Sequence, residues 1–148
     1  MWSQYRYNNN TQIFTMNLSN VLAVSGLPGL YELASNRPNG LLVVPIEGGK
    51  SKFCSSRKHQ FTPLETVAIY TWSDTAELKT VFNSMMEKIV DVPLPDPKSS
   101  KDVLNEYFEQ ILPEFDRERV YPNDIKKVIK WFVALESQGY LAASDEEE

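Results

Sequence analysis

Residues 30–55 of the chain read LYELASNRPNGLLVVPIEGGKSKFCS, and short apolar runs alternate there with clusters of turn residues. The Asn39-Gly40 pair suits the left-handed backbone of a tight hairpin, and Gly48-Gly49 marks a second hairpin turn. Leu41–Ile46, between the two turns, is apolar except for Pro45 and predicts a strand. The stretch therefore predicts a meander of short antiparallel strands.

The strand pattern continues on both sides of this stretch. Thr66–Trp72 is rich in β-branched and aromatic residues and is predicted to be the last strand. On the N-terminal side, Asn17–Leu22 predicts a short capped helical turn, and Gly26–Gly29 breaks the chain after it. Four or five short strands at this spacing favour a small curled sheet that closes into a β-barrel, because closure removes exposed edges.

The spacing of apolar residues becomes helical near residue 73, and three helices are predicted from there to residue 141. Gly139 is expected at the left-handed position that ends the third helix, with Tyr140 packed back on Leu135 in a Schellman arrangement. The residues expected to open the helices are Asp74 with Glu77, Ser99 with Asp102, and Asn123.

The predicted fold class is α+β, an antiparallel β-barrel followed by a three-helix region. In chain order, the predicted parts are a flexible leader (1–15), the β-barrel (16–72), a connecting helix (73–90), a proline-rich linker (91–99), a helical domain (100–141) and an acidic tail (142–148).

Charge is distributed unevenly along the 148 residues, whose formal net charge is −5. Residues 16–72 hold five basic and three acidic groups, whereas residues 73–148 hold 9 basic and 17 acidic groups. The balance argues against a general nucleic-acid coat, because phosphate binding needs positive charge. No apolar run approaches the roughly 20 residues of a membrane span, so no membrane association is expected. A cytoplasmic location is expected, because the N-terminus lacks a secretory pattern and Cys54 has no partner for an internal disulfide.

No catalytic, cofactor-binding or metal-binding motif is found in the sequence. Gly26–Gly29 lacks the third glycine and the following helix of a dinucleotide site, so a simple turn is favoured. Cys54 and His59 are the single residues of their kinds, and Cys54 ends a strand where a small apolar residue would serve equally. The acids of residues 116–124 are expected to form salt bridges with neighbouring arginines. We therefore expect no cofactor, no metal and no enzymatic activity.

Two basic surfaces are candidate binding sites. The first lies on a hairpin and its exit loop, near aromatic residues that either stack on a ligand or form the barrel core, the second alternative being favoured. The second lies on the outer side of the third helix, where Trp131 either anchors a partner or widens the buried stripe. The candidate residues are Lys50, Lys52, Arg57 and Lys58 on the first surface, and Lys126, Lys127, Lys130 and Trp131 on the second.

Several strings of the sequence resemble a bacterial family of domain-of-unknown-function proteins, over about residues 16–141. The resemblance implies an SH3-like N-terminal domain followed by a small helical domain, and it implies no activity. It is carried by Asn20–Tyr31 (NVLAVSGLPGLY), Asn39-Gly40, Ala68–Thr71 (AIYT), Lys98–Asp102 (KSSKD), Leu112-Pro113, Arg119–Tyr121 (RVY) and Asp124–Val128 (DIKKV).

The function expected from these observations is a non-catalytic module that binds another protein, through the barrel or the third helix. The alternative is an RNA- or ribosome-associated accessory protein that binds through the basic hairpin. The net charge of +2 over residues 16–72 favours the alternative, and the acidic second half opposes it.

Overall fold

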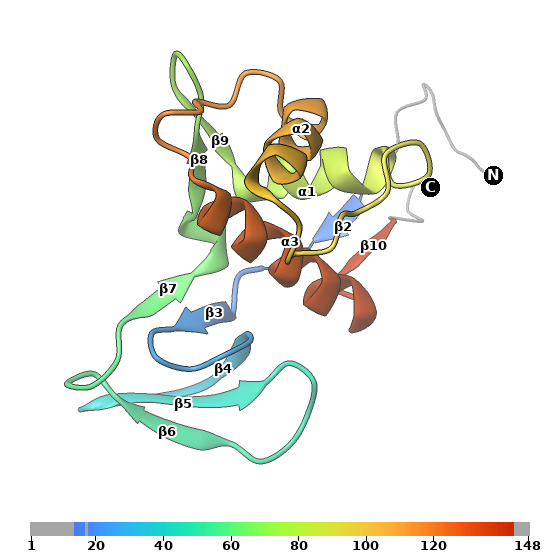
Figure 1. Cartoon of the computed structure of the whole chain (residues 1–148). Coiled ribbons are helices and arrows are strands. Elements are labelled where there is room, and N and C mark those ends of the chain that lie inside the picture. Colours follow the sequence, from blue (N-terminus) through green and yellow to red (C-terminus); the bar gives the residue numbers. More distant parts are fainter. Residues whose placement is uncertain (1–13, 17, 144–148) are drawn as a thin grey trace.

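Residues 14–16 and 18–143 are described by the computed structural model, and they form antiparallel sheets and three α-helices (Figure 1). The α+β class predicted from the sequence is therefore confirmed. The largest sheet has the strand order β6-β5-β4-β3-β7. Its strands are β3 (Val21–Val24), β4 (Tyr31–Arg37), β5 (Gly40–Pro45), β6 (Lys52–Ser55) and β7 (Phe61–Pro63).

Both predicted hairpins are present in this sheet. β4 and β5 are joined by a two-residue turn, since Arg37 pairs with Gly40. Gly40 does not adopt the left-handed backbone expected of it, and it is required for another reason. A Cβ at this position would lie 2.1 Å from the backbone carbonyl oxygen of Cys54 on the neighbouring strand β6. At the β5–β6 turn, Gly48 and Gly49 do have positive φ angles, of 96° and 126°.

The five strands do not close into a barrel within the described residues, because β6 and β7 form the two edges of the sheet. The pairing expected for Thr66–Trp72 is wrong. The chain leaves the sheet through η1 (Leu64–Thr66), a 3₁₀ turn, and β8 (Ala68–Tyr70) then pairs with β9 (Thr75–Glu77). Thr71 stabilises this reversal, since its hydroxyl accepts a hydrogen bond of 3.0 Å from the backbone N–H three residues later.

Strand β3 is buried on both faces. The turn predicted before it is present at Leu18–Val21, where the backbone N–H of Val21 donates to the carbonyl oxygen of Leu18 at 3.2 Å, but Val21 and Leu22 belong to β3 and not to a helix. The predicted cap, Asn17, lies outside the described residues. Successive side chains of a strand point to opposite faces of a sheet. Val21 accordingly lies in a large core shared with the helices, whereas Leu22 and Val24 lie in a smaller core within the curl of the sheet. The other buried members of the smaller core are Tyr31, Val43 and Cys54.

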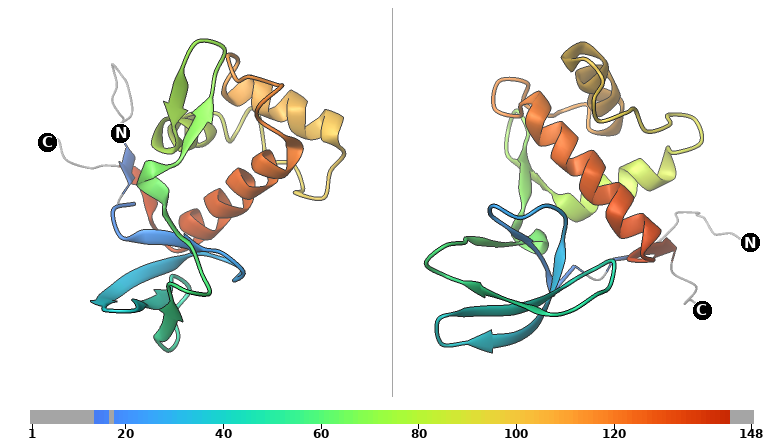
Figure 2. Two further views of the ribbon diagram at one scale, coloured as in Figure 1. Left: turned by 90° about the vertical axis from the view of Figure 1, so that its left-hand side faces the viewer. Right: turned by 60° about the horizontal axis from the view of Figure 1, so that its bottom comes forward.

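Helix α3 (Pro122–Ser137) lies between the five-stranded sheet and the two other helices, α1 (Leu78–Glu87) and α2 (Lys101–Ile111), as Figures 1 and 2 show. The large core gathers the apolar faces of all three helices. It also includes Leu30 and Leu64, which come from the sheet side of the molecule. The sheet and the helices therefore share one core.

The predicted starts of α1 and α2 need correction. Glu77 is the N-cap of α1 and makes no capping hydrogen bond, and Asp74 lies in the turn between β8 and β9. The predicted capping box is therefore wrong, because the chain is still extended there. Ser100 rather than Ser99 caps α2, and its hydroxyl accepts a hydrogen bond of 3.3 Å from the backbone N–H of Val103.

Helix α3 begins before the predicted cap, Asn123, which lies inside the helix. Tyr121 is the N-cap and Pro122 is the first helical residue, a position that proline suits because its N–H group is not needed there. At the other end Gly139 has φ of 82°, and the backbone N–H of Tyr140 donates to the carbonyl oxygen of Leu135 at 2.9 Å. The predicted Schellman ending is confirmed.

The two ends of the described chain pair with each other, since β2 (Phe14–Met16) lies antiparallel to β10 (Leu141–Ala143). The predicted leader and acidic tail are therefore corrected at their inner ends, where residues 14–15 and 142–143 join this sheet. The remainder of both segments lies outside the described residues. In the predicted proline-rich linker, Val92 and Leu94 pack against the large core.

We predict that Gly40→Ala destabilises the protein by on the order of 3 kcal/mol, because the new Cβ would force β5 and β6 apart. Urea unfolding followed by circular dichroism measures the change. Gly48→Ala is the control: it has a positive φ but open space around it, and should cost about 1 kcal/mol. Equal losses in the two variants would contradict the steric role of Gly40.

We also predict that the sheet and the helices unfold together. Leu64→Ala should lower the free energy of unfolding by roughly 2–5 kcal/mol, because Leu64 is fully buried in the shared core. Tryptophan fluorescence and far-ultraviolet circular dichroism should give one coincident transition in both the wild type and the variant. Two separate transitions would contradict a shared core.

Candidate functional site

The outer side of α3 carries the second predicted surface. Lys127, Lys130, Trp131 and Ala134 recur at helical spacing and share one face, while the opposite face of the helix is buried. Trp131 is only partly buried: it packs against the large core and also lines two surface pockets. Both alternatives considered for Trp131 therefore describe part of its environment.

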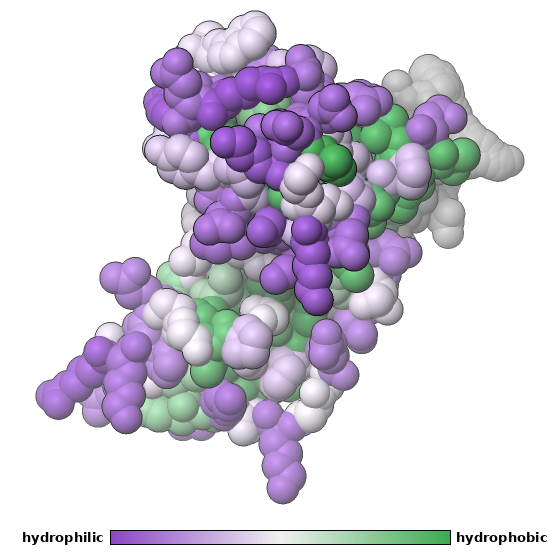
Figure 3. Space-filling view, viewed as in Figure 1, coloured by the Kyte–Doolittle hydropathy of each residue, from purple (hydrophilic) through white to green (hydrophobic). Residues whose placement is uncertain are grey.

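A groove separates α3 from the loop between β3 and β4, and we call it the α3 groove. Its volume is about 550 Å³. Lys127, Lys130, Trp131 and Ala134 form one wall, and residues 23–30 form most of the other. In Figure 3 green apolar side chains reach the surface between the helical part and the sheet, next to purple hydrophilic ones.

The loop that forms the second wall is held by three contacts to the segment before β7, one of which is a hydrogen bond of 2.7 Å from the backbone N–H of Gln60 to the Ser25 hydroxyl. The backbone N–H of Ser25 donates to the carbonyl oxygen of Gln60 at 2.9 Å, and His59 Nδ1 lies 2.7 Å from the carbonyl oxygen of Ser25. Gly26 and Gly29 have φ angles of 82° and 80°, which explains why glycine occurs at both bends. His59 thus fixes the loop.

A smaller hollow of about 220 Å³ lies on the other side of Trp131, between α3 and β8. Arg119 borders it and stacks on Tyr70, with 4.3 Å between the guanidinium carbon and the ring centroid. Arg119 Nε also donates to Asp116 Oδ2 at 2.9 Å. This ion pair confirms part of the predicted salt bridging, whereas Arg117 pairs with Glu109 on α2.

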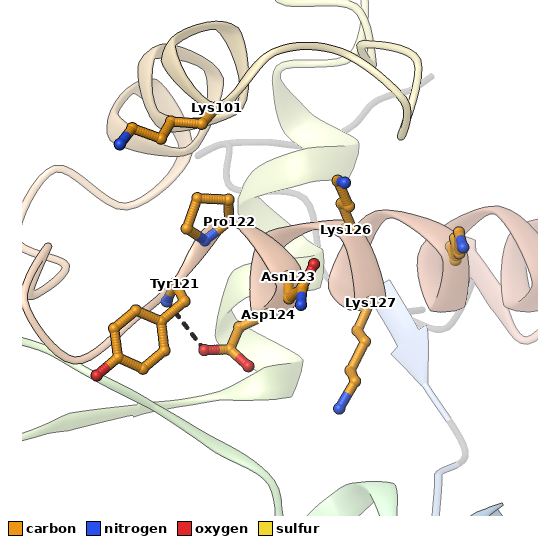
Figure 4. A pocket seen from close by; sticks show the side chains of 8 residues that line it. Lys101, Tyr121, Pro122, Asn123, Asp124, Lys126 and Lys127 are labelled. Atoms are coloured by element: carbon orange, nitrogen blue, oxygen red, sulfur yellow. Dashed lines mark hydrogen bonds between the residues drawn. The ribbon is translucent and has the colours of Figure 1, made fainter. Parts of the chain in front are cut away.

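A third, wide pocket of about 790 Å³ surrounds the start of α3. Figure 4 shows Lys126 and Lys127 pointing to opposite sides of the helix, and Lys101, which also lines the pocket, on α2. The carboxylate of Asp124 accepts a hydrogen bond of 2.9 Å from the backbone N–H of Tyr121. The lysine ammonium groups do not converge on one point, so they do not form a cradle for one small anion.

Lys127 lines all three pockets, and they meet on this side of α3. Among the described residues, no carboxylate forms an ion pair with any of the four lysines that line these pockets, which are Lys101 on α2 and Lys126, Lys127 and Lys130 on α3. A chain with a net charge of −5 thus has a local basic face with uncompensated ammonium groups.

The first predicted surface lies elsewhere. Its four basic residues are exposed on β6, an edge strand, and in the loops around it, and none of them lines these three pockets. The favoured interpretation of the nearby aromatics as barrel core holds in part for Phe61, which is half-buried and packs against the smaller core. It is wrong for Phe53, which is 52% exposed on the edge strand β6, and for Tyr70 and Trp72, which are 46% and 74% exposed and lie outside the five-stranded sheet.

The groups capable of acid–base or nucleophilic chemistry lie apart from one another. Cys54 is buried in the smaller core, whereas His59 bonds to Ser25. Burial raises the pKa of the Tyr107 hydroxyl, which has no hydrogen-bond partner and lines none of the three pockets. Within the described ranges, no three His, Cys, Asp or Glu side chains gather as metal ligands would. No helix in those ranges combines the length and apolar character needed to cross a membrane.

Sequence reasoning missed three parts of this face: Lys101, the Arg119–Tyr70 stack and the loop wall. Gly26–Gly29 was interpreted as a simple turn, and the turn is real. Its position opposite α3 depends on contacts between residues about 100 positions apart in the chain, and no local pattern reports such contacts. In the sequence, the loop wall is marked only by Gly26 and Gly29 with Pro28 between them.

The Asp116–Arg119 pair makes a pH-dependent prediction. Hydrogen bonds from the backbone N–H of Glu118 and then from Arg119 lower the pKa of Asp116. Arg119→Gln should raise that pKa only part of the way to its ordinary value, because the Glu118 N–H remains. Carbon-13 NMR titration of the carboxyl group measures this.

A group with a lowered folded-state pKa stabilises the fold above its unfolded pKa, and the effect is lost as the pH falls through the folded value. The part of the destabilisation by Arg119→Gln that comes from the lost Asp116 pair should therefore be present at neutral pH and disappear in acid, whereas the part that comes from the lost stack on Tyr70 should persist. Arg117→Gln, whose native partner is Glu109, should leave the pKa of Asp116 unchanged. A full return of the Asp116 pKa to its ordinary value in Arg119→Gln would contradict the role of the Glu118 N–H.

Comparison with known proteins gives two family matches and one similar structure. Residues 18–64 match a domain of unknown function (DUF5606), and residues 67–135 match a second domain of unknown function (DUF6852). A search of curated proteins finds no match. The solution NMR structure of a structural-genomics target from Bacteroides vulgatus is 31% identical, with a TM-score of 0.67. The alignment covers 83% of this chain and 88% of that one. The predicted resemblance is confirmed, and the chain belongs to this bacterial family, which joins two domains of unknown function.

Proposed function

We propose that this protein is a non-catalytic interaction module that binds another protein through the outer side of α3. One observation carries the proposal: three surface pockets meet at Lys127, and two of them share Trp131. No described carboxylate forms an ion pair with the lysines of this face, which are Lys101, Lys126, Lys127 and Lys130. A partly exposed tryptophan surrounded by hollows and cationic side chains is a typical centre of a protein interface.

The energetics of Trp131 support this role. Its inner part already packs against the large core, so the side chain is held in place before a partner arrives. A held side chain loses little rotamer freedom on binding, and the area that it buries then contributes more fully to affinity. Lys127 lies one helical turn before Trp131, and Lys130 directly precedes it in the sequence. The methylene groups of both lysines can cover apolar surface while their ammonium groups contact the partner.

We propose further that the five-stranded sheet is an open SH3-like barrel acting as the scaffold of this site, in a cytoplasmic protein. The strand order supports the SH3-like barrel. The first of the five strands, β3, pairs both with the next strand, β4, and with the last strand, β7. A bulge between Leu33 and Ser35 bends β4, as a strand shared by the two halves of such a barrel requires. In this arrangement residues 16–72 supply the loop wall, and the helical part supplies α3.

The alternative is RNA binding through the β5–β6 hairpin. Phe53 is 52% exposed on β6, the edge strand that also carries Lys52, and an exposed aromatic ring offers a stacking surface. The same features also protect an edge strand from pairing with another chain. No pocket among the three joins this hairpin to the α3 face, so we favour the protein-binding function.

Affinity capture from native cells with cross-linking tests the proposal. The wild type should recover a reproducible partner protein, and Trp131→Ala should reduce its recovery at least about tenfold, as expected for an interface hot spot. Trp72→Ala is the matched control, because Trp72 is 74% exposed and lies outside all three pockets. A second pair consists of the test variant Lys127→Glu and the control variant Lys79→Glu, because Lys79 is exposed on α1.

Equal recovery of the partner by Trp131→Ala and the wild type would refute this binding face. Binding of mixed-sequence RNA in a filter assay, weakened by Lys52→Glu with Lys58→Glu and unaffected by Lys127→Glu, would support the alternative instead.

A further inference from the structure

The α3 groove also indicates the chemistry of its partner. We infer that it binds an extended, acidic segment of the partner protein, with one apolar side chain against Trp131 and flanking carboxylates on Lys127 and Lys130. This inference rests on the proposed function and adds the class of ligand to it. Charge, shape and the limited exposure of Trp131 support it in turn.

Charge complementarity is the first argument. Lys127 and Lys130 line the groove, Lys126 and Lys101 extend the basic face beyond it, and no described carboxylate neutralises any of the four. A partner with carboxylates would remove this uncompensated charge, and the attraction would also speed association. The chain as a whole has a net charge of −5, so an acidic segment is attracted only to its local basic surfaces, and of the two basic surfaces only the α3 face is lined by the three pockets.

Geometry favours an extended segment over a compact anion. Lysines three residues apart on a helix have Cβ atoms roughly 5–6 Å apart. Side chains at alternate positions of an extended chain recur on one side about 7 Å apart, which the flexible lysine stems can match. The ammonium groups around the start of α3 point in different directions (Figure 4), so a single phosphate or carboxylate could contact few of them.

Shape supplies the place for an apolar side chain. The groove of about 550 Å³ lies within the size range of ligand sites, and Leu27, Pro28 and Ala134 line it beside Trp131. One leucine-sized or phenylalanine-sized side chain between the loop and Trp131 would bury apolar surface on both.

A nucleic acid fits these observations less well. Base stacking needs an open aromatic face, and Trp131 is partly covered by its packing against the core. An acidic peptide avoids this requirement, because an aliphatic side chain needs only a contact with the edge or part of the ring.

Fluorescence polarisation with three synthetic probes tests the inference on the full chain. The first probe is a labelled eight-residue peptide with two leucines among six glutamates, the second replaces the glutamates with lysines, and the third is an eight-nucleotide polyuridine. We expect only the glutamate peptide to bind, and its binding should weaken several-fold between about 0.05 M and 0.5 M salt.

Variants then locate the site. Lys127→Glu with Lys130→Glu, and separately Trp131→Ala, should each weaken the glutamate peptide at least about tenfold, whereas Lys79→Glu should leave it within about twofold of the wild type. Circular dichroism checks that each variant is folded, and Trp131→Phe replaces Trp131→Ala if the latter unfolds. Amide chemical shifts in the wild type should move most in residues 25–30 and 127–134.

Three outcomes would overturn the inference. The first is that the glutamate peptide does not bind. The second is that the variant Lys127→Glu with Lys130→Glu binds this peptide as tightly as the wild type does. The third is that the polyuridine binds more tightly than the glutamate peptide. If Trp131→Ala still abolishes capture of the native partner in such a case, the proposed function survives and the partner has another chemistry. If capture is also unaffected by Trp131→Ala, the proposed function fails with it.

Discussion

Burial of β3 on both faces is the constraint on which the rest of this structure depends. Val21 faces the helices and Leu22 faces the interior of the sheet, so a four-residue strand belongs to two cores at once. Neither core is complete without it. The smaller core has few members, and a sheet of this size gains stability by sharing a strand with a larger apolar cluster.

The groove is a consequence of the same arrangement. With β3 tied to the helices through Val21, the loop that follows it must run alongside α3 before the chain returns as β4. A hydrogen bond of 2.9 Å between the Tyr140 hydroxyl and Glu32 also joins the end of α3 to the sheet. The candidate binding face therefore lies at a junction that two hydrophobic cores hold in place, as a preorganised site requires.

Local charge and net charge have separate effects in this protein. The acidic residues are spread over the chain, and several are used within the fold: Asp124 bonds to the start of α3, and Asp116 pairs with Arg119. The lysines on the outer side of α3 have no such partners among the described residues. A basic face on an acidic molecule attracts negatively charged partners and repels positively charged ones. Salt screens this interaction beyond about a Debye length.

The sequence by itself determined the elements whose causes are local. The turn at Gly48-Gly49, the period of α3 and the Schellman ending at Gly139 all depend on residues within a few positions of one another. The hairpin at Asn39-Gly40 is also present, but Gly40 is required there by Cys54 on the neighbouring strand. The lysines and Trp131 were found in the same way, because a helix places residues three and four apart on one side. The tertiary structure alone decided which strands pair, that β8 leaves the sheet, and that β3 is a strand. Those outcomes depend on apolar contacts between segments that are distant in the sequence. The apolar residues of β3 fit a helical period as well as a strand period, and only their burial in two separate cores selects the strand.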